Sequence, residues 1–259
     1  MISIRLTKAE KLRRLLASIF YAAYTVAMFY CLINSTSSDD RLLYSGLLVF
    51  VPLGVLYEFI RFFYSMAVDA LNEQCDTELA KKYLKFIRRF NLFKSYRAQI
   101  AYLGGFILLD DDKPEDAREY IISKLGSMNT VNRIMDFQYN YLLFSCCAAL
   151  KDKHKIGEYF IALKKTIDMK ERPGNDLISL GNLICGVYGL VSRNDREAAD
   201  SFQKVKPENL STRERARYYF YSAQLDVRYS DKNKMEDNYD KAIVLAPEMK
   251  LIIDHKPKI

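Results

Sequence analysis

The sequence has few of the residues that enzymes use for chemistry. Among its 259 residues there are two histidines, His154 and His255, and no tryptophan. Neither histidine has a Cys or His neighbour at the spacing of metal ligands. No G-x-S-x-G, H-E-x-x-H or Walker-type glycine loop occurs either. The sequence therefore predicts no catalytic residue, no metal site and no cofactor, and we expect a protein that is not an enzyme.

Five cysteines are present, and no two of them form a C-x-x-C pair. An odd number without that spacing is typical of reduced cytosolic thiols. Cys146 and Cys147 lie in an apolar stretch without a basic neighbour that lowers a thiol pKa, so we expect no redox role. The acidic run 110–112 fits a cation site or a solvated turn between helices. The turn is favoured because the spacing matches no calcium loop.

Two long apolar runs stand near the start of the chain. Residues 15–33 contain no charge, and residues 42–60 contain only Glu58. As a helix, each run spans about 28 Å, close to the hydrocarbon thickness of a bilayer. The sequence predicts a transmembrane hairpin over 15–64 that contacts the lipid bilayer through residues 15–60, with a kink at Pro52 and Gly54. A buried soluble hairpin and a signal peptide are the alternatives, but no A-x-A-like cleavage site follows the first run.

Basic residues set the expected orientation of this hairpin. The tip, residues 1–14, carries five basic residues and one acid, whereas the connecting loop has Asp39 and Asp40 against Arg41. Because positive charge stays on the cytoplasmic side, we expect an integral membrane protein with both termini in the cytoplasm. The Lys-, Ile-, Tyr- and Asn-rich composition fits a bacterial plasma membrane, although the apolar runs do not distinguish it from an organelle membrane.

The charge beyond the hairpin is mild. The net charge of the chain is +7, and acids are interleaved with bases after the second apolar run. This argues against a nucleic-acid partner. The segment Lys81–Phe90 is interpreted as an amphipathic helix whose basic face is either solvated or in contact with anionic lipid headgroups.

The region after residue 65 has a helical pattern throughout. Apolar residues recur at three- and four-residue spacing, and strand-like alternation is rare. Pro114 and Ser211 provide helix-start signals. The pattern predicts roughly nine helices, with breaks at Asn91, 110–114, 126–132, 151–155, 172–174, 193–195, 207–211 and 230–233.

A register of small and large residues repeats along these helices. Gly105 is followed twelve residues later by Ala117 and four residues after that by Ile121. Small residues let two antiparallel helices approach, and a large residue one turn later fills the space to the next unit, so the units are expected to stack. The same offsets recur at Ser145, Gly157 and Ile161, at Gly186, Ala198 and Phe202, and at Ala223, Met235 and Tyr239.

The pattern resembles that of tetratricopeptide repeats over roughly residues 76–250. The segment YDKAIVLAP, with Tyr239, Ala242 and Pro247, matches the end of that family's repeat, and Phe202 matches its aromatic position. The family's tryptophan is missing and the spacing between units is longer. The resemblance implies an α-solenoid of antiparallel helix pairs. The expected fold class is therefore all-α, and the expected architecture is a transmembrane hairpin followed by this solenoid. An irregular helical bundle is the alternative to the solenoid.

These patterns together define the expected domains. They are a basic cytoplasmic tip (1–14), the transmembrane hairpin (15–64), a juxtamembrane helix or half-repeat (65–94), the repeat domain (95–250) and a tail (251–259). Tetratricopeptide arrays usually bind other proteins, so the resemblance implies a groove that binds a protein or peptide. By the family pattern, its lining is Tyr102, Phe106, Tyr139, Leu142, Leu183, Val187, Arg217, Phe220 and Gln224. A lining that is mostly apolar suits an apolar or extended peptide, and core packing is the alternative for each residue.

Three functions fit this organisation. The first is a membrane-anchored adaptor or scaffold whose cytoplasmic repeats bind a protein or peptide partner. The second is an accessory subunit of a larger membrane complex, a transporter or secretion machine, contacted through the hairpin; the small-xxx-small pair Ala23 and Ala27 supports it. The third is an enzyme or sensor without a recognisable motif. The oligomeric state is left open by these patterns.

Overall fold

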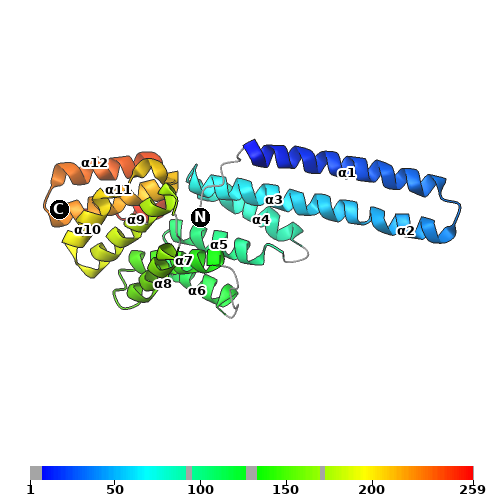
Figure 1. The fold of residues 1–259 in the computed structure, drawn as a ribbon. Helices are drawn as coiled ribbons and strands as arrows, with labels where there is room; N and C mark the ends of the chain where they lie inside the picture. Colours follow the sequence, from blue (N-terminus) through cyan, green and yellow to red (C-terminus); the bar gives the residue numbers. More distant parts are fainter. Residues whose placement is uncertain (1–7, 92–94, 127–132, 170–172, 259) are drawn as a thin grey trace.

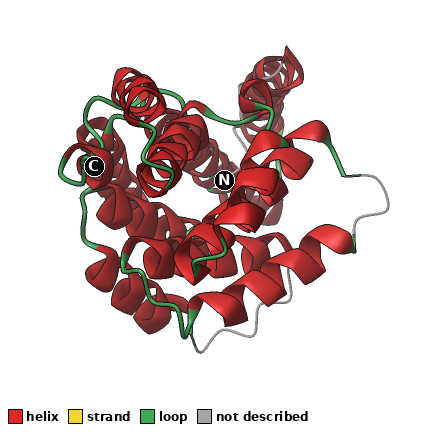
Figure 2. Cartoon of the chain, turned by 90° about the vertical axis from the view of Figure 1, so that its left-hand side faces the viewer, coloured by secondary structure: helices red, strands yellow, loops and turns green. Residues whose placement is uncertain are grey.

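The protein is all-α, as the sequence predicts. The computed structural model describes residues 8–91, 95–126, 133–169 and 173–258, and helices and loops account for all of them (Figure 2). In chain order the helices are α1 (Lys8–Asn34), α2 (Ser38–Leu48), α3 (Phe50–Asn72), α4 (Thr77–Phe90), α5 (Arg97–Asp110), α6 (Pro114–Leu125), α7 (Arg133–Ala149), α8 (Ile156–Asp168), α9 (Asn175–Ser192), α10 (Asp195–Gln203), the 3-10 helix η1 (Pro207–Asn209), α11 (Thr212–Arg228), α12 (Lys232–Leu245) and α13 (Lys250–Ile253).

The helix ends follow the capping chemistry of the sequence. Pro114 is the first residue of α6. The Ser211 hydroxyl accepts a hydrogen bond from the backbone N–H of Glu214 at 3.4 Å, and the Asp76 carboxylate accepts one from the N–H of Leu79 at 2.7 Å. Such caps satisfy N–H groups that have no partner inside the helix. The described residues between 77 and 245 form nine α-helices. The predicted breaks at 126–132 and 172–174 lie partly outside the described residues, and the other predicted breaks in this range fall at helix ends.

Helices α1, α2 and the first part of α3 form an arm, residues 8–59, that extends away from the rest of the molecule (Figure 1). α1 packs alongside α2 and α3. The Tyr24 hydroxyl donates a hydrogen bond to the Leu47 carbonyl at 3.5 Å. A Cβ added to Gly54 would lie 2.5 Å from the Tyr21 ring. Glycine at position 54 therefore allows α1 to pack closely against α3.

A break separates α2 from α3 near Pro52. α2 ends at Leu48, Val49 is the junction and α3 begins at Phe50. Proline has no N–H to donate to the carbonyl four residues earlier, here that of Leu48, and its ring crowds that carbonyl. At the predicted kink the structure has a one-residue interruption at Val49, whose backbone stays in the helical region (φ −64°, ψ −27°), so that α2 and α3 continue as one helical segment, Ser38–Asn72.

Helix α3 connects the arm to the remaining helices without a linker. Its side chains up to Phe59 are exposed or partly exposed, whereas Ile60 and much of the segment from Ala67 to Asn72 are buried. The expected boundary between hairpin and juxtamembrane helix, at residues 64 and 65, falls inside this helix. The arm is therefore held in a set direction relative to the helical body, residues 60–258.

The helical body consists of pairs of consecutive helices. The pairs are α3–α4, α5–α6, α7–α8, α9–α10 and α11–α12, and the first helix of each pair contacts the first helix of the next. The repeated register follows these pairs, with Gly186 on α9 and Ala198 and Phe202 on α10. A Cβ on Gly186 would overlap the Phe202 ring, so the small residue makes room for the large one. Ile161 departs from the register, because 68% of its surface is exposed.

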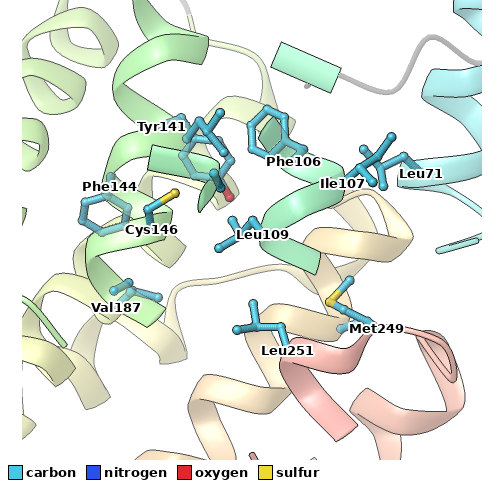
Figure 3. Packing of buried hydrophobic residues seen from close by; sticks show 14 of the residues in the cluster. Leu71, Phe106, Ile107, Leu109, Tyr141, Phe144, Cys146, Val187, Met249 and Leu251 are labelled. Atoms are coloured by element: carbon cyan, nitrogen blue, oxygen red, sulfur yellow. The ribbon is translucent and has the colours of Figure 1, made fainter. Parts of the chain in front are cut away.

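The last helices of the chain pack against the first helices of the helical body. α11 contacts α3 and α13 contacts α5, and the Thr212 hydroxyl donates to the Glu73 carboxylate at 3.2 Å. Met249 and Leu251 are buried in the same hydrophobic cluster as Leu109 (Figure 3). Residues 251 and 252, which the sequence places in a tail, therefore belong to the core. The late helices α11 and α13 thus pack against the early helices α3 and α5.

Helix α5 lies inside the helical body. Eleven of its 14 residues are buried, since α3, α4, α6, α7 and α13 all contact it. Its sequence is apolar on every side, which is the pattern of a helix with neighbours all around. The glycine at 105 makes room for the Leu142 side chain of α7.

Candidate functional site

The nine predicted groove residues lie on the expected helices but mostly in the interior. Seven of them have exposed fractions of 3% or less, and only Tyr139 and Gln224 are partly exposed. These seven residues therefore belong to the helix–helix core and do not line an open groove, because neighbouring side chains cover them. By helix the nine residues are Tyr102 and Phe106 on α5, Tyr139 and Leu142 on α7, Leu183 and Val187 on α9, and Arg217, Phe220 and Gln224 on α11.

A buried ion cluster occupies the place where α5, α7 and α11 meet. Arg213 donates from Nε to one carboxylate oxygen of Asp110 at 2.6 Å and from Nη2 to the other at 2.7 Å. Its Nη1 donates to Glu214 at 2.7 Å. The guanidinium carbon also lies 4.7 Å from the centre of the Phe106 ring. Arg213 is 1% exposed, so these protein groups take the place of water around its charge.

Glu214 joins this pair to a second arginine. The Tyr141 hydroxyl donates to one Glu214 oxygen, and Arg217 Nη1 lies 3.5 Å from the same oxygen. Arg217 Nη1 also donates to the Tyr141 hydroxyl at 3.3 Å. The ion cluster, Asp110, Tyr141, Arg213, Glu214 and Arg217, thus pairs two carboxylates with two guanidinium groups. A balanced and hydrogen-bonded set of this kind is what makes burial of four ionisable groups tolerable.

The charges in the ion cluster stabilise one another. Burial by itself raises the pKa of Glu214, but the guanidinium groups of Arg217 and Arg213 outweigh burial and hold that pKa below its usual value. Burial likewise opposes the charge of Arg213, but the Asp110 and Glu214 carboxylates raise the arginine's pKa. Burial and the Glu214 charge raise the pKa of Tyr141 well above its usual value. At neutral pH Glu214 and the arginines are charged, and Tyr141 keeps its proton.

The sequence analysis does not find this cluster. It places Asp110 in a solvated turn, which is wrong, because the side chain is 1% exposed and paired with Arg213. Asp111 is also buried, and one of its carboxylate oxygens lies 2.6 Å from Lys81 Nζ. Asp112 remains partly exposed, 2.9 Å from the His255 ring nitrogen. The signal available in the sequence is that Asp110 directly follows a continuous apolar helix without an intervening turn residue.

The arrangement of the cluster is suited to holding helices together. Its charged groups bond mainly to one another, and they join helices that are far apart in the sequence. Among the residues that the structure describes, no three His, Cys, Asp or Glu side chains gather where a metal ion would bind. Burial raises the pKa of the Cys146 thiol to about 12 and that of Cys147 to about 11. Both thiols are therefore protonated at neutral pH and poor nucleophiles.

The surface of the arm is the second candidate site. On α1, Tyr21 and Met28 are partly buried, whereas Phe20, Val26 and Ile33 are 64%, 69% and 75% exposed. Most of the large apolar side chains that are exposed in the described chain lie between Leu16 and Phe62. A helix that is apolar on all sides is normally covered by protein or by lipid, and the described residues leave much of the arm uncovered.

The length of the apolar helices limits what they can span. Among the described residues, the helical segment Ser38–Asn72 is long and apolar enough to cross a membrane, and only 6% of its apolar window is buried. The apolar part of α1, Ile19–Asn34, is shorter, and its 16 residues reach about 24 Å against a hydrocarbon core of about 30 Å. One candidate span is therefore found among the described residues, and the predicted pair of spans is not supported. The low burial also argues against a buried soluble hairpin.

A shallow depression of about 440 Å³ runs along α8. It is lined by Ile161, Lys164, Lys165, Asp168 and Met169. Ile161 and Met169 are 68% and 55% exposed. This places two large apolar side chains beside two lysines on the outside of the helical body, at the position where the repeated register fails.

Comparison of the chain with models of known protein families, with curated proteins and with solved structures found no match. The arm, the ion cluster and the α8 depression are therefore the features on which a functional proposal rests.

Proposed function

We propose that this protein is a membrane-anchored adaptor or scaffold. The arm enters the lipid bilayer and the helical body binds a protein or peptide partner on the cytoplasmic side. The observation that carries this proposal is the exposure of the arm. A long apolar helix with 6% of its apolar window buried continues without a linker into a packed helical body. Lipid around the arm would remove this apolar surface from water.

We further propose that α1 enters the bilayer together with α2 and α3. Tyr21 packs against Gly54, and Tyr24 bonds to the Leu47 carbonyl. If α3 lies in the bilayer, these contacts hold α1 beside it in the bilayer. The bilayer accommodates a short apolar helix by thinning locally, or the side chains that flank the helix reach to the interface. Both termini are then cytoplasmic, and the turn around Ser37 lies outside.

The helix pairs are proposed to be tetratricopeptide-like, with the partner on their outer surface. The support is the register of small residues at the helix crossings and the pairing of consecutive helices. Because seven of the nine groove residues are buried, the partner surface is assigned instead to the α8 depression. An extended segment with apolar side chains to cover Ile161 and Met169 and a carboxylate to meet Lys164 and Lys165 would fit it.

Membrane anchoring is tested first, with the full-length chain. We expect the protein to stay in the membrane pellet at alkaline pH. A cysteine introduced at Ser37 should react with a membrane-impermeant maleimide from the outside, and a cysteine introduced at the exposed Asp240 should react only after lysis. Release by alkali would contradict the anchor. Equal labelling of both positions before lysis would contradict the proposed orientation.

The adaptor role is tested by photo-crosslinking from the α8 depression in intact cells. A photoreactive amino acid at Ile161 or Met169 is compared with one at Val244, which is 80% exposed on α12. We expect a discrete crosslinked protein from α8 only, lost when Lys164 and Lys165 are both changed to Glu. No discrete product from α8, or the same product from Val244, would contradict this assignment.

A second candidate function is an accessory subunit of a larger membrane complex. Ala23 and Ala27 favour it, because both lie on the exposed side of α1 and not against α2 or α3. Small residues on a free helix face allow another membrane helix to approach. Changing both alanines to Ile should disrupt a complex of this kind, whereas Val26→Ile, on the same face, should not. A complex that survives the alanine changes would contradict the accessory-subunit function.

A further inference from the structure

The basic face of α4 lies at the place where the arm joins the helical body. α4 runs back along α3, since Phe63 packs against Tyr83 with ring centres 5.9 Å apart and Phe59 packs against Phe86 at 5.5 Å. Later residues of α4 thus lie beside earlier residues of α3. The last turn of α4, with Arg89, is therefore level with the end of the apolar part of the arm.

The exposed side of α4 is basic. Lys82, Lys85 and Arg89 are all exposed, and their spacing of three and four residues places them on one helix face. They form no ion pair with any residue that the structure describes. Lys81, by contrast, is bound to Glu78 and Asp111, and Arg88 donates to the Tyr120 hydroxyl at 2.8 Å. The three side chains, named here the α4 basic stripe, remain available to an external anion.

Aromatic residues mark the same level on α3. Tyr57, Phe59 and Phe62 are 46%, 43% and 38% exposed, and the Tyr57 ring lies 5.8 Å from that of Tyr96. Tyrosine is enriched at the boundary between hydrocarbon and headgroups. The aromatic belt and the α4 basic stripe are thus independent features at one height, where apolar surface gives way to charged surface.

From this juxtaposition we infer that the α4 basic stripe binds the anionic headgroups of the membrane into which the arm inserts. The inference rests on the proposed anchor and goes beyond it, because it names the lipid class and the residues that recognise it. Each basic side chain near an anionic surface contributes an interaction equivalent to about a fivefold change in affinity. Binding at three points would also hold the helical body close to the membrane surface.

The test uses the full-length chain reconstituted in vesicles of phosphatidylcholine and phosphatidylglycerol in equal parts. The protein is extracted with a polymer that retains surrounding lipid, and the two lipids are quantified by mass spectrometry. We expect phosphatidylglycerol to be enriched over the bulk by a factor of roughly two or more. The factor should return to one in the variant Lys82→Gln, Lys85→Gln, Arg89→Gln, and it should fall at high salt.

A matched control removes the same charge elsewhere. Lys153, Lys204 and Lys206 are exposed in turns of the helical body, and their change to Gln should leave the enrichment unaltered. Equal loss in this control would assign the effect to net charge and overturn the inference. Loss of the enrichment on adding inorganic phosphate at constant ionic strength would identify a free-phosphate site and also overturn it.

Alkaline extraction of the same vesicles separates the two proposals. If the protein stays in the membrane but phosphatidylglycerol is not enriched, lipid binding by the α4 basic stripe is refuted and the proposed membrane anchor is not. A protein that alkali releases refutes the anchor, and the lipid inference falls with it. Circular dichroism of each variant shows whether its helical fold is intact.

Discussion

Arg213 and Asp110 are 103 positions apart in the chain, yet the Arg213 Nε and Nη2 atoms lie 2.6 and 2.7 Å from the two oxygens of the Asp110 carboxylate. Both side chains are 1% exposed. The bidentate pair joins the last residue of α5 to the first turn of α11 and so connects the two ends of the set of helix pairs. This contact and the contact of α13 with α5 both join the end of the chain to an early helix.

Removing one partner of this pair should destabilise the fold strongly. Asp110→Ala leaves the Arg213 charge buried without its bidentate partner, and such losses cost about 3–5 kcal/mol. We expect thermal unfolding of the full-length chain in detergent, followed by circular dichroism, to occur at a clearly lower temperature. Asp240→Ala, at an exposed position, serves as the control. The double change Asp110→Leu with Arg213→Met should recover much of the loss, because it leaves no unpaired charge. Equal unfolding temperatures for Asp110→Ala and the control would show that the cluster contributes nothing.

Glu214 should make the stability depend on acid pH. Its pKa in the folded protein is below the usual value, so its contribution is fully present above the unfolded-state pKa of about 4.3 and is lost as the pH falls through the folded-state pKa. Glu214→Gln should therefore be less stable than the wild type at neutral pH, and the difference should shrink as the pH falls below about 4. Unfolding temperatures measured across this range, with the exposed Glu119→Gln as control, check the prediction. A constant difference at all pH values would contradict it.

Replacing each of two glycines of α9 by alanine should have opposite effects on the stability of the protein. A Cβ at Gly186 would overlap the Phe202 ring, whereas a Cβ at Gly181 would lie 3.5 Å from the Ile167 side chain, an ordinary contact. Gly186→Ala should lower the free energy of unfolding by about 1–3 kcal/mol, because the added methyl group overpacks the helix crossing. Gly181→Ala should be neutral or stabilising by up to about 1 kcal/mol, because alanine favours the helix. Denaturant unfolding of the two variants measures the contrast, and equal effects would show that the α9–α10 crossing is not tightly packed.

The chain after α12 should be needed for stability. Ile252 is fully buried, whereas its neighbour Ile253 is 40% exposed. Ile252→Ala should cost about 2–5 kcal/mol by leaving a cavity against the core, and Ile253→Ala should cost much less. The reaction rate of the buried thiols Cys146 and Cys147 with a maleimide reports the opening of the core. Similar rates in the two variants would mean that α13 does not close the core.

The local parts of the fold were predictable because local interactions decide them. The helix ends at Asn91, Pro114 and Ser211 follow from caps and proline chemistry within a few residues. The small residue at Gly186 predicts a close helix crossing because only two consecutive helices need to meet there. The exposed arm follows from an apolar run that is longer than a core helix requires.

The sites were less predictable because they depend on where distant helices meet. The pattern that selects Tyr102, Phe106 and Phe220 identifies the inner side of each first helix, but it does not say whether that side faces a groove or another helix. The segment from Asp110 to Asp112 is acidic in sequence, yet the Asp110 carboxylate is buried because Arg213 lies opposite. No local pattern connects positions 110 and 213.

The sequence by itself thus determined the all-α class, most helix ends after α3, the pairing of consecutive helices and the apolar character of the arm. Each of these depends on short-range periodicity, capping and hydrophobicity. Only the tertiary structure decided that the last pair packs against the first, that the predicted groove is core and that α4 places its basic stripe beside the end of the arm. These features arise from contacts between residues far apart in the chain, whose geometry is set by the summed packing of all the helices between them.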